Sequence, residues 1–165
     1  MANSVTDAFM TLDALDRRIL RAVQARATLS SEELAVSCGT SPSTALRRLS
    51  AMRQNKIITG EVAIINSAAV GRGLILILGV RLEGENDREA SEFIARIAAH
   101  VCVMQFYFVT GTKDYVIIIN ARTMAEYDDF VKSELVGNPR VFLSETNVVI
   151  RPLKMSLAVP IDEPT

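Results

Sequence analysis

The stretch LSSEELAVSCGTSPSTALRRLSAMRQNK, residues 29–56, contains two helix starts separated by one glycine turn. Ser30 and Glu33 have the spacing of a capping box, in which each side chain accepts a hydrogen bond from the backbone amide of the other residue. Gly39 follows at a position where a left-handed residue ends a helix. Ser41 then provides a second N-cap. The stretch therefore predicts two short helices joined by a tight turn, which is a helix-turn-helix.

The second helix begins at Pro42, whose missing N–H costs nothing at a first helical position. Side chains placed at about 100° per residue divide this helix into two faces. The apolar face contains Ala45, Leu46, Leu49 and Met52. Arg47 points almost directly away from them, among short polar residues that let a helix approach a surface closely. This outer face predicts a helix that lies in the DNA major groove, and a solvated surface helix is the alternative.

Double-stranded DNA is therefore the expected partner. Arg47 is the candidate for a base edge, while Arg53 and Lys56, near the helix end, are suited to phosphates. The helix N-terminus also favours a phosphate, through its free amides and its dipole. The predicted DNA-binding residues are Ser41, Ser43, Thr44, Arg47, Arg48, Arg53 and Lys56.

The chain of 165 residues has a formal net charge of −1, which hides an asymmetry. Residues 1–60 have a net charge of +3 and the remainder has −4, so a local anionic partner is expected at the N-terminal part. We expect a cytoplasmic protein without a leader or a membrane span, because the longest apolar run, residues 74–80, is too short to cross a bilayer.

Cys38, Cys102 and the single histidine, His100, are too few and too scattered for a disulfide framework or a metal site. Both cysteines are expected to be small buried apolar groups. No clustered acid–base pair stands out, so we expect no catalytic residue, no metal and no cofactor.

The second half of the chain predicts two successive βαβ units. Strands are expected at residues 74–83, 101–110, 115–121 and 141–151. Helices are expected after Asp87 and after Thr123, where Thr123 and Glu126 have the spacing of another capping box. The order βαββαβ predicts a ferredoxin-like α/β sandwich whose helices cover one face of the sheet. The other face remains apolar and needs a partner, so at least a homodimer is expected.

The predicted fold class is α+β, with a helix-turn-helix (winged-helix-like) domain joined by a strand linker to the ferredoxin-like sandwich. GEVAIIN, residues 60–66, is the predicted linker strand, and Gly71 and Gly73 mark the boundary. The expected organisation is a tail at 1–11, the DNA-binding domain at 12–59, the linker at 60–73, an effector-binding and oligomerisation domain at 74–155 and a tail at 156–165.

Between Leu12 and Lys154 the chain resembles the Lrp/AsnC (feast/famine) family of transcription regulators. The resemblance is carried by LDALDRRIL, LSSEELA, CGTSPSTALRRL and NKIITGEVAIIN, and by VTGTKDYVI at the family's Gly-x-x-Asp-Tyr turn. It implies dimers that assemble further into tetramers or octamers, control of nearby genes and a response to a free amino acid. The chain departs from the family at Lys56, where Gly is common, and at Ser50 and Ala51, where a basic pair is common.

Gly111, Thr112 and Asp114 are the predicted effector-binding residues, at a turn that the resemblance places between subunits. Asp114 suits an amino acid's ammonium, and free amides near Gly111 suit its carboxylate. Thr112 stands where the family often has an acid, which favours an apolar amino acid such as leucine or methionine over a basic one. Ser144 to Val148 is a weaker candidate, and an ordinary hairpin turn is the alternative interpretation.

Two other functions remain open. One is a regulator that binds no small molecule and whose second domain only assembles. The other is a sirohaem-decarboxylase-like enzyme, since relatives of that kind share the two domains. That chemistry needs proton donors and cations around a polyanionic ring, and the sequence offers only His100.

Overall fold

The computed structural model of the chain describes residues 12–84 and 87–162. These residues form two compact units. The first unit comprises the chain up to Ala63 together with the residues from Met155 onward. The second unit runs from Ile64 to Lys154.

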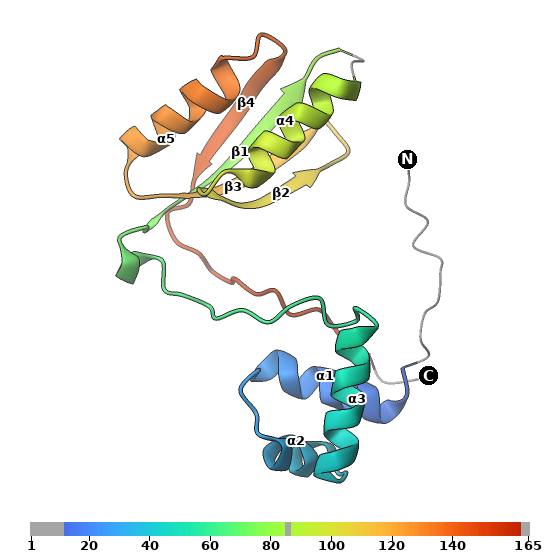
Figure 1. Cartoon of the computed structure of the whole chain (residues 1–165). Helices are drawn as coiled ribbons and strands as arrows, with labels where there is room; N and C mark the ends of the chain where they lie inside the picture. Colours follow the sequence, from blue (N-terminus) through green and yellow to red (C-terminus); the bar gives the residue numbers. More distant parts are fainter. Residues whose placement is uncertain (1–11, 85–86, 163–165) are drawn as a thin grey trace. The chain divides into compact units, whose positions relative to one another are not determined.

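Three helices make up the first unit: α1 (Ala14–Ala25), α2 (Ser31–Cys38) and α3 (Pro42–Gln54) (Figure 1). Local side-chain caps begin each of them, and those at Ser30 and Ser41 were predicted. The Ser30–Glu33 capping box is complete, and Ser41 Oγ accepts from the amide of Thr44 at 3.3 Å. Gly39 ends α2 in the left-handed conformation, with φ 65°. The predicted helix-turn-helix is confirmed.

The apolar faces of these helices enclose one core. Its buried members are Ile19, Leu20, Leu34, Ala35, Cys38, Ala45, Leu49 and Met52. Leu46 is an exception, because the sequence predicted it on the buried face and its side chain is 47% exposed. The neighbouring helices cover only the stripe through Ala45, Leu49 and Met52, and Leu46 lies beyond the edge of that stripe.

The predicted strand at residues 60–66 is not formed in the single chain. Val62 and Ile64 are 73% and 82% exposed. A strand needs a neighbour for its backbone hydrogen bonds, and the described part of this chain pairs none with residues 60–66. The segment is followed by a short turn of helix, η1 (Ala68–Val70), where Asn66 Oδ1 accepts from the amide of Ala68 at 3.1 Å.

The second unit is a four-stranded antiparallel sheet with two helices on one face (Figure 1). Its elements are β1 (Leu74–Leu82), α4 (Asp87–Ala99), β2 (Val103–Phe108), β3 (Tyr115–Ala121), α5 (Met124–Phe130) and β4 (Val141–Val148). A wide turn of π-helix, η2 (Val131–Val136), continues α5. The strand order β2-β3-β1-β4 with this connectivity confirms the ferredoxin-like sandwich.

Alternate residues of the strands face the two helices. Leu76, Leu78 and Val80 of β1 are fully buried there against Phe93 and Ile97 of α4. The other face of the sheet carries Ile75, Ile77, Val116 and Ile118, which remain half-buried in the single chain. An apolar sheet face of this kind is suited to a second copy of the chain.

Candidate DNA-binding surface and effector turn

The outer face of α3 is short, polar and cationic. Its exposed residues include Ser43, Arg47, Ser50 and Gln54, which recur at helical spacing. Arg47 is exposed and forms no hydrogen bond or ion pair with any residue that the structure describes. A guanidinium in this state is available to an incoming partner without first breaking a contact within the protein.

The N-terminus of α3 is organised by Ser41. Its hydroxyl contacts the Thr44 hydroxyl at 2.9 Å and the Ser43 hydroxyl at 3.2 Å. These three residues, all predicted DNA-binding residues, therefore lie together at the positive end of the helix dipole.

Arg48 has a different environment from Arg47. Its Nη1 contacts Asp16 Oδ2 at 3.1 Å and Asp13 Oδ2 at 2.9 Å, both from the start of α1. The Asp16 side chain is only 3% exposed. The same two aspartates form the capping box that begins α1, and the amide of Asp16 lowers the pKa of Asp13. Arg48 was predicted from sequence to bind DNA, but its contacts are those of a residue that fixes α3 on α1.

Arg53 and Lys56 lie at the end of α3. The Arg53 guanidinium forms two hydrogen bonds to Glu61 Oε1, from Nε at 2.9 Å and from Nη2 at 2.5 Å. Both side chains of this pair are exposed, so a phosphate can compete with Glu61 for Arg53. Lys56 is exposed and has a left-handed backbone with φ 58°. This conformation accounts physically for the glycine that the family often has at this position.

The predicted effector residues occupy the turn between β2 and β3. Gly111 has φ 119°, and a side chain at its Cβ would meet no atom within 4 Å, so its backbone is open. Thr112 is exposed. Asp114 closes the turn onto β1, because its Oδ2 accepts from the amide of Leu82 at 2.8 Å. The carboxylate therefore has a structural contact in addition to any ligand that it binds.

The weaker candidate, residues 144–148, lies on β4 beside the centre of β1. Ser144 Oγ donates to the carbonyl of Gly79 at 2.8 Å, at the position where the register between β1 and β4 shifts. Lys113 forms an ion pair with Glu145. A side chain at Gly79 would collide with Lys113, since its Cβ would lie 2.5 Å from Lys113 Cδ. A side chain at position 79 would therefore displace the flexible end of the Lys113 side chain.

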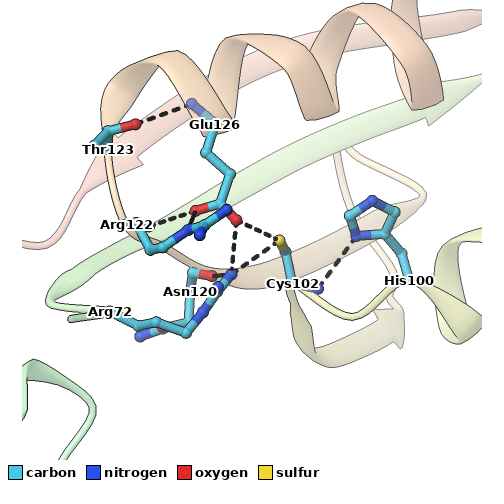
Figure 2. A network of polar contacts seen from close by, with 7 residues as sticks. All are labelled: Arg72, His100, Cys102, Asn120, Arg122, Thr123 and Glu126. Carbon is cyan, nitrogen blue, oxygen red and sulfur yellow. Dashed lines mark hydrogen bonds and ion pairs between the residues drawn. The ribbon is translucent and has the colours of Figure 1, made fainter. Parts of the chain in front are cut away.

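A network of polar contacts surrounds Arg72, which lies two residues before the start of β1 (Figure 2). Arg72 Nη2 contacts the carbonyl of Asn120 at 2.9 Å, Glu126 Oε1 at 3.1 Å and Cys102 Sγ at 3.1 Å. These partners come from the end of β3, from α5 and from the turn before β2. Arg72 therefore fixes the last part of the linker to three elements of the second unit.

Glu126 is the acidic member of this network. Its Oε2 accepts from the amide of Arg122 at 2.6 Å, which with the Arg122 and Arg72 guanidiniums lowers its pKa to about 2. The predicted capping box is therefore only half formed. Thr123 Oγ1 accepts from the amide of Glu126 at 3.2 Å, but the carboxylate turns to the two arginines instead of Thr123 (Figure 2).

Cys102 and His100 have structural contacts. Both cysteines are buried, as the sequence predicted, but the surroundings of Cys102 are polar, because its Sγ contacts Arg72 and Glu126. Burial, followed by the charge of Glu126, raises the pKa of Cys102, which disfavours a reactive thiolate. His100 Nδ1 accepts from the amide of Cys102 at 3.2 Å, and its ring packs edge-on against Phe130. One nitrogen of the single histidine is thus committed to the backbone.

Within residues 12–84 and 87–162, no group of three His, Cys, Asp or Glu side chains is arranged to hold a metal ion. In the same ranges, no helix is long and apolar enough to cross a membrane.

Prediction from the sequence missed two features of the surface. Leu46 is exposed beside Arg47, although helical periodicity assigned it to the core. Residues 156–162 were predicted as part of a tail, but residues 159–162 contact α1 in the first unit. The alternation of apolar residues from Leu153 to Ile161 was the available signal for that segment.

Comparison with known protein families gives two matches. The family model described as the Lrp/AsnC ligand binding domain matches residues 75–159, and the AsnC-type helix-turn-helix domain matches residues 12–53. Together the two matches include α1, α2, α3 except Gln54, and the ferredoxin-like sheet except Leu74.

Individual relatives are similar over almost their whole length. An uncharacterised helix-turn-helix transcriptional regulator of Sinorhizobium fredii is 37% identical, over 94% of this chain and 92% of that protein. The leucine-responsive regulatory protein of Rhizobium meliloti is 32% identical, over 91% and 96%.

Among solved structures, a transcriptional regulator of Neisseria meningitidis in complex with L-methionine is similar with a TM-score of 0.86 and 26% identity, over 92% of this chain and 98% of that one. An AsnC family transcriptional regulator of Agrobacterium tumefaciens has a TM-score of 0.83 and 25% identity, over 90% and 96%.

Proposed function

Because the chain belongs to the Lrp/AsnC family of helix-turn-helix transcriptional regulators, we propose that it reads a specific operator with α3 and responds to a small apolar amino acid. In this proposal residues 12–59 bind DNA, residues 60–73 link, and residues 74–155 bind the effector and assemble subunits. The amino acid lies at the turn from Gly111 to Asp114, between two copies of the chain.

The observation that carries DNA binding is the unpaired Arg47 on the outer face of α3. A guanidinium can donate two hydrogen bonds to O6 and N7 of guanine in the major groove. Leu46 beside it is 47% exposed and suited to the methyl group of a thymine. Ser41, Ser43 and Thr44 at the helix start, with Arg53 and Lys56 at its end, then contact phosphates on either side.

DNA binding is tested with Arg47→Ala. The preferred site is first obtained by sequencing the genomic fragments that the purified protein retains. On that site the variant is expected to lose about 1–3 kcal/mol of binding free energy and to discriminate less at one base pair. Arg151→Ala removes the same charge from the second unit and is the control. Wild-type affinity and selectivity in Arg47→Ala would show that α3 does not read bases through this residue.

Three observations support an apolar amino-acid effector. The similar regulator of Neisseria meningitidis is described in complex with L-methionine. The open backbone at Gly111 leaves room for a carboxylate, and Asp114 supplies a negative charge for an ammonium. Thr112 adds no second negative charge, which a basic side chain would require.

Homodimers, with further assembly to tetramers or octamers, complete the proposal. The half-buried apolar face of the sheet supports the first step, because a second copy would cover Ile77 and Ile118. Two α3 helices related by a two-fold axis would contact half-sites one or more helical turns apart, roughly 34 Å or a multiple of that. Light scattering tests this, and a stable monomer at micromolar concentration would contradict it.

A further inference from the structure

The chain after β4 returns to the first unit. From Leu153 onward the apolar residues alternate with others: Leu153, Met155, Leu157, Val159 and Ile161. Leu157 and Val159 are 70% and 64% exposed, so burial of this stripe does not hold the whole segment in place. The contacts that hold it lie at its far end, on α1.

Three side chains of α1 bind the backbone of this segment. They stand at helical spacing and each donates to a carbonyl at 3.1 Å: Arg17 to Asp162, Arg21 to Ile161, and Gln24 to Val159. Gln24 Oε1 also accepts from the amide of Val159 at 2.7 Å, so this side chain bonds both polar groups of one residue. The outer face of α1 thus binds an extended backbone much as a neighbouring strand would.

Two further residues fix the position of the segment. Ile161 packs against the core of the first unit and is half-buried. Pro160 has no N–H and cannot take part in regular strand pairing, which leaves the neighbouring carbonyls available to the side chains of α1. The apolar anchor and the backbone contacts act at the same place, so docking is specific to residues 159–162.

The segment is also the continuation of β4. In the sheet, Leu76 of β1 is paired with Val148 of β4, and the amide of Val149 donates to the carbonyl of Ile75 at 2.9 Å. The two chain connections between the units therefore leave from neighbouring strands. The segment that docks on α1 is therefore a second covalent connection to the first unit, in addition to residues 60–73.

We infer that the outer face of α1 is a docking surface for the chain's own C-terminal segment, and that the docked segment carries changes in β4 to the DNA-binding domain. The docking itself stands on contacts within the first unit. The regulatory consequence rests on the proposed function, since it requires that the first unit binds DNA.

The docking is tested in full-length protein with a matched pair of variants. Ile161→Ala removes the anchor, whereas Leu157→Ala removes an exposed side chain of the same size from the same segment. Hydrogen exchange of the α1 amides is expected to become about tenfold faster in Ile161→Ala and to stay unchanged in Leu157→Ala. Gln24→Ala should also make hydrogen exchange of the α1 amides faster, but by a smaller factor than Ile161→Ala.

The consequence for DNA is measured on the preferred duplex. Ile161→Ala is expected to weaken binding by roughly threefold to tenfold, because part of the binding energy must restore the docked state. A synthetic peptide of residues 155–165 should restore α1 protection in a chain ended after Lys154. Unchanged α1 exchange in Ile161→Ala overturns the docking. Faster exchange with unchanged DNA affinity overturns the coupling, and failure of the wild type to bind any DNA overturns only the proposed function.

Discussion

Lys56 combines two physical effects at one position. Its left-handed backbone, φ 58°, costs an ordinary L-residue about 1–2 kcal/mol, and its charge is suited to a phosphate. Lys56→Gly is therefore expected to raise the free energy of unfolding by about 1 kcal/mol while it weakens DNA binding on all sequences alike. Urea denaturation and titration with DNA at several salt concentrations measure the two effects.

Lys56→Ala is the matched control, because it removes the same charge and keeps the backbone strain. Both variants should flatten the dependence of log affinity on log salt by about one unit, and only the glycine variant should gain stability. Equal stability of the two variants would mean that the left-handed backbone at this position carries no cost.

Glu126 predicts a pH effect on the second unit. Its pKa of about 2 lies below the ordinary value of 4.5, chiefly because the amide of Arg122 donates to it. A carboxyl whose pKa is lowered by folding stabilises the fold above its unfolded pKa, and this contribution is lost as the pH falls through the folded value. Stability due to Glu126 should therefore be complete above about pH 4.5 and should disappear as the pH approaches about 2.

The measurement is acid unfolding of the wild type and of Glu126→Gln. Asp13 and Glu33 also have lowered pKa values and titrate in both proteins, so only the difference between the two curves reports Glu126. The variant should be less stable near neutral pH, and the two curves should converge as the pH falls to about 2. If the difference in stability between the wild type and Glu126→Gln stayed constant down to pH 2, titration of Glu126 would not be the cause of that difference.

At the level of elements, Arg48 is expected to hold α3 on α1. Arg48→Ala leaves the Asp16 carboxylate, which is only 3% exposed, without its cation. Removal of one partner from such a pair is expected to lower the free energy of unfolding by about 2–3 kcal/mol. Arg53→Ala is the control, because its ion pair with Glu61 is exposed on both sides and should contribute less than about 1 kcal/mol.

Urea denaturation of both variants distinguishes a role of Arg48 in holding α3 on α1 from the DNA binding predicted from sequence. Arg48→Met keeps most of the aliphatic stem and should restore part of the packing but not the ion pair. Wild-type stability in Arg48→Ala, together with weaker DNA binding, would favour the predicted DNA contact of Arg48 over this structural role.

Helix starts were predictable from sequence because their causes are local. Asp13, Ser30, Ser41 and Thr123 each bond an amide three residues ahead, so a few consecutive letters contain the whole interaction. The strand predicted at residues 60–66 is not formed in the single chain for the opposite reason, because a strand depends on a partner that can lie anywhere in the sequence or in another chain.

The candidate DNA-binding surface was likewise predictable only where it depends on local spacing. The outward direction of Arg47 follows from helical periodicity within one element. The contact of Arg48 with Asp16 spans 32 residues, and the contact of Gln24 with Val159 spans 135, so neither follows from local spacing. Glu126 shows the same limit, since its spacing from Thr123 fits a capping box but Arg72, 54 residues away, competes for the carboxylate.

At the scale of the whole molecule, regulation requires that an effector distinguishes two states of an assembly. A ligand shifts an equilibrium only by the difference between its affinities for the two states. A site at the turn from Gly111 to Asp114, shared by two copies, would satisfy this condition because only one arrangement of subunits completes it. Titration calorimetry of the wild type with the twenty amino acids tests whether one of them binds. Assembly size is measured in parallel.

The informative variant at this turn is Asp114→Asn. Asp114→Ala would also remove the hydrogen bond from the Leu82 amide, whereas asparagine retains an acceptor for it and loses only the charge. We expect leucine or methionine to bind the wild type with a measurable heat and a change in assembly size. Asp114→Asn should keep the assembly of the unliganded protein but bind the amino acid at least about tenfold more weakly, because a charged hydrogen bond contributes roughly 1.5–3 kcal/mol. Thr112→Glu should shift the preference toward a basic amino acid, because it adds a negative charge beside the site. Equal binding by Asp114→Asn would move the site elsewhere, and no heat with any amino acid would leave a regulator whose second domain only assembles subunits.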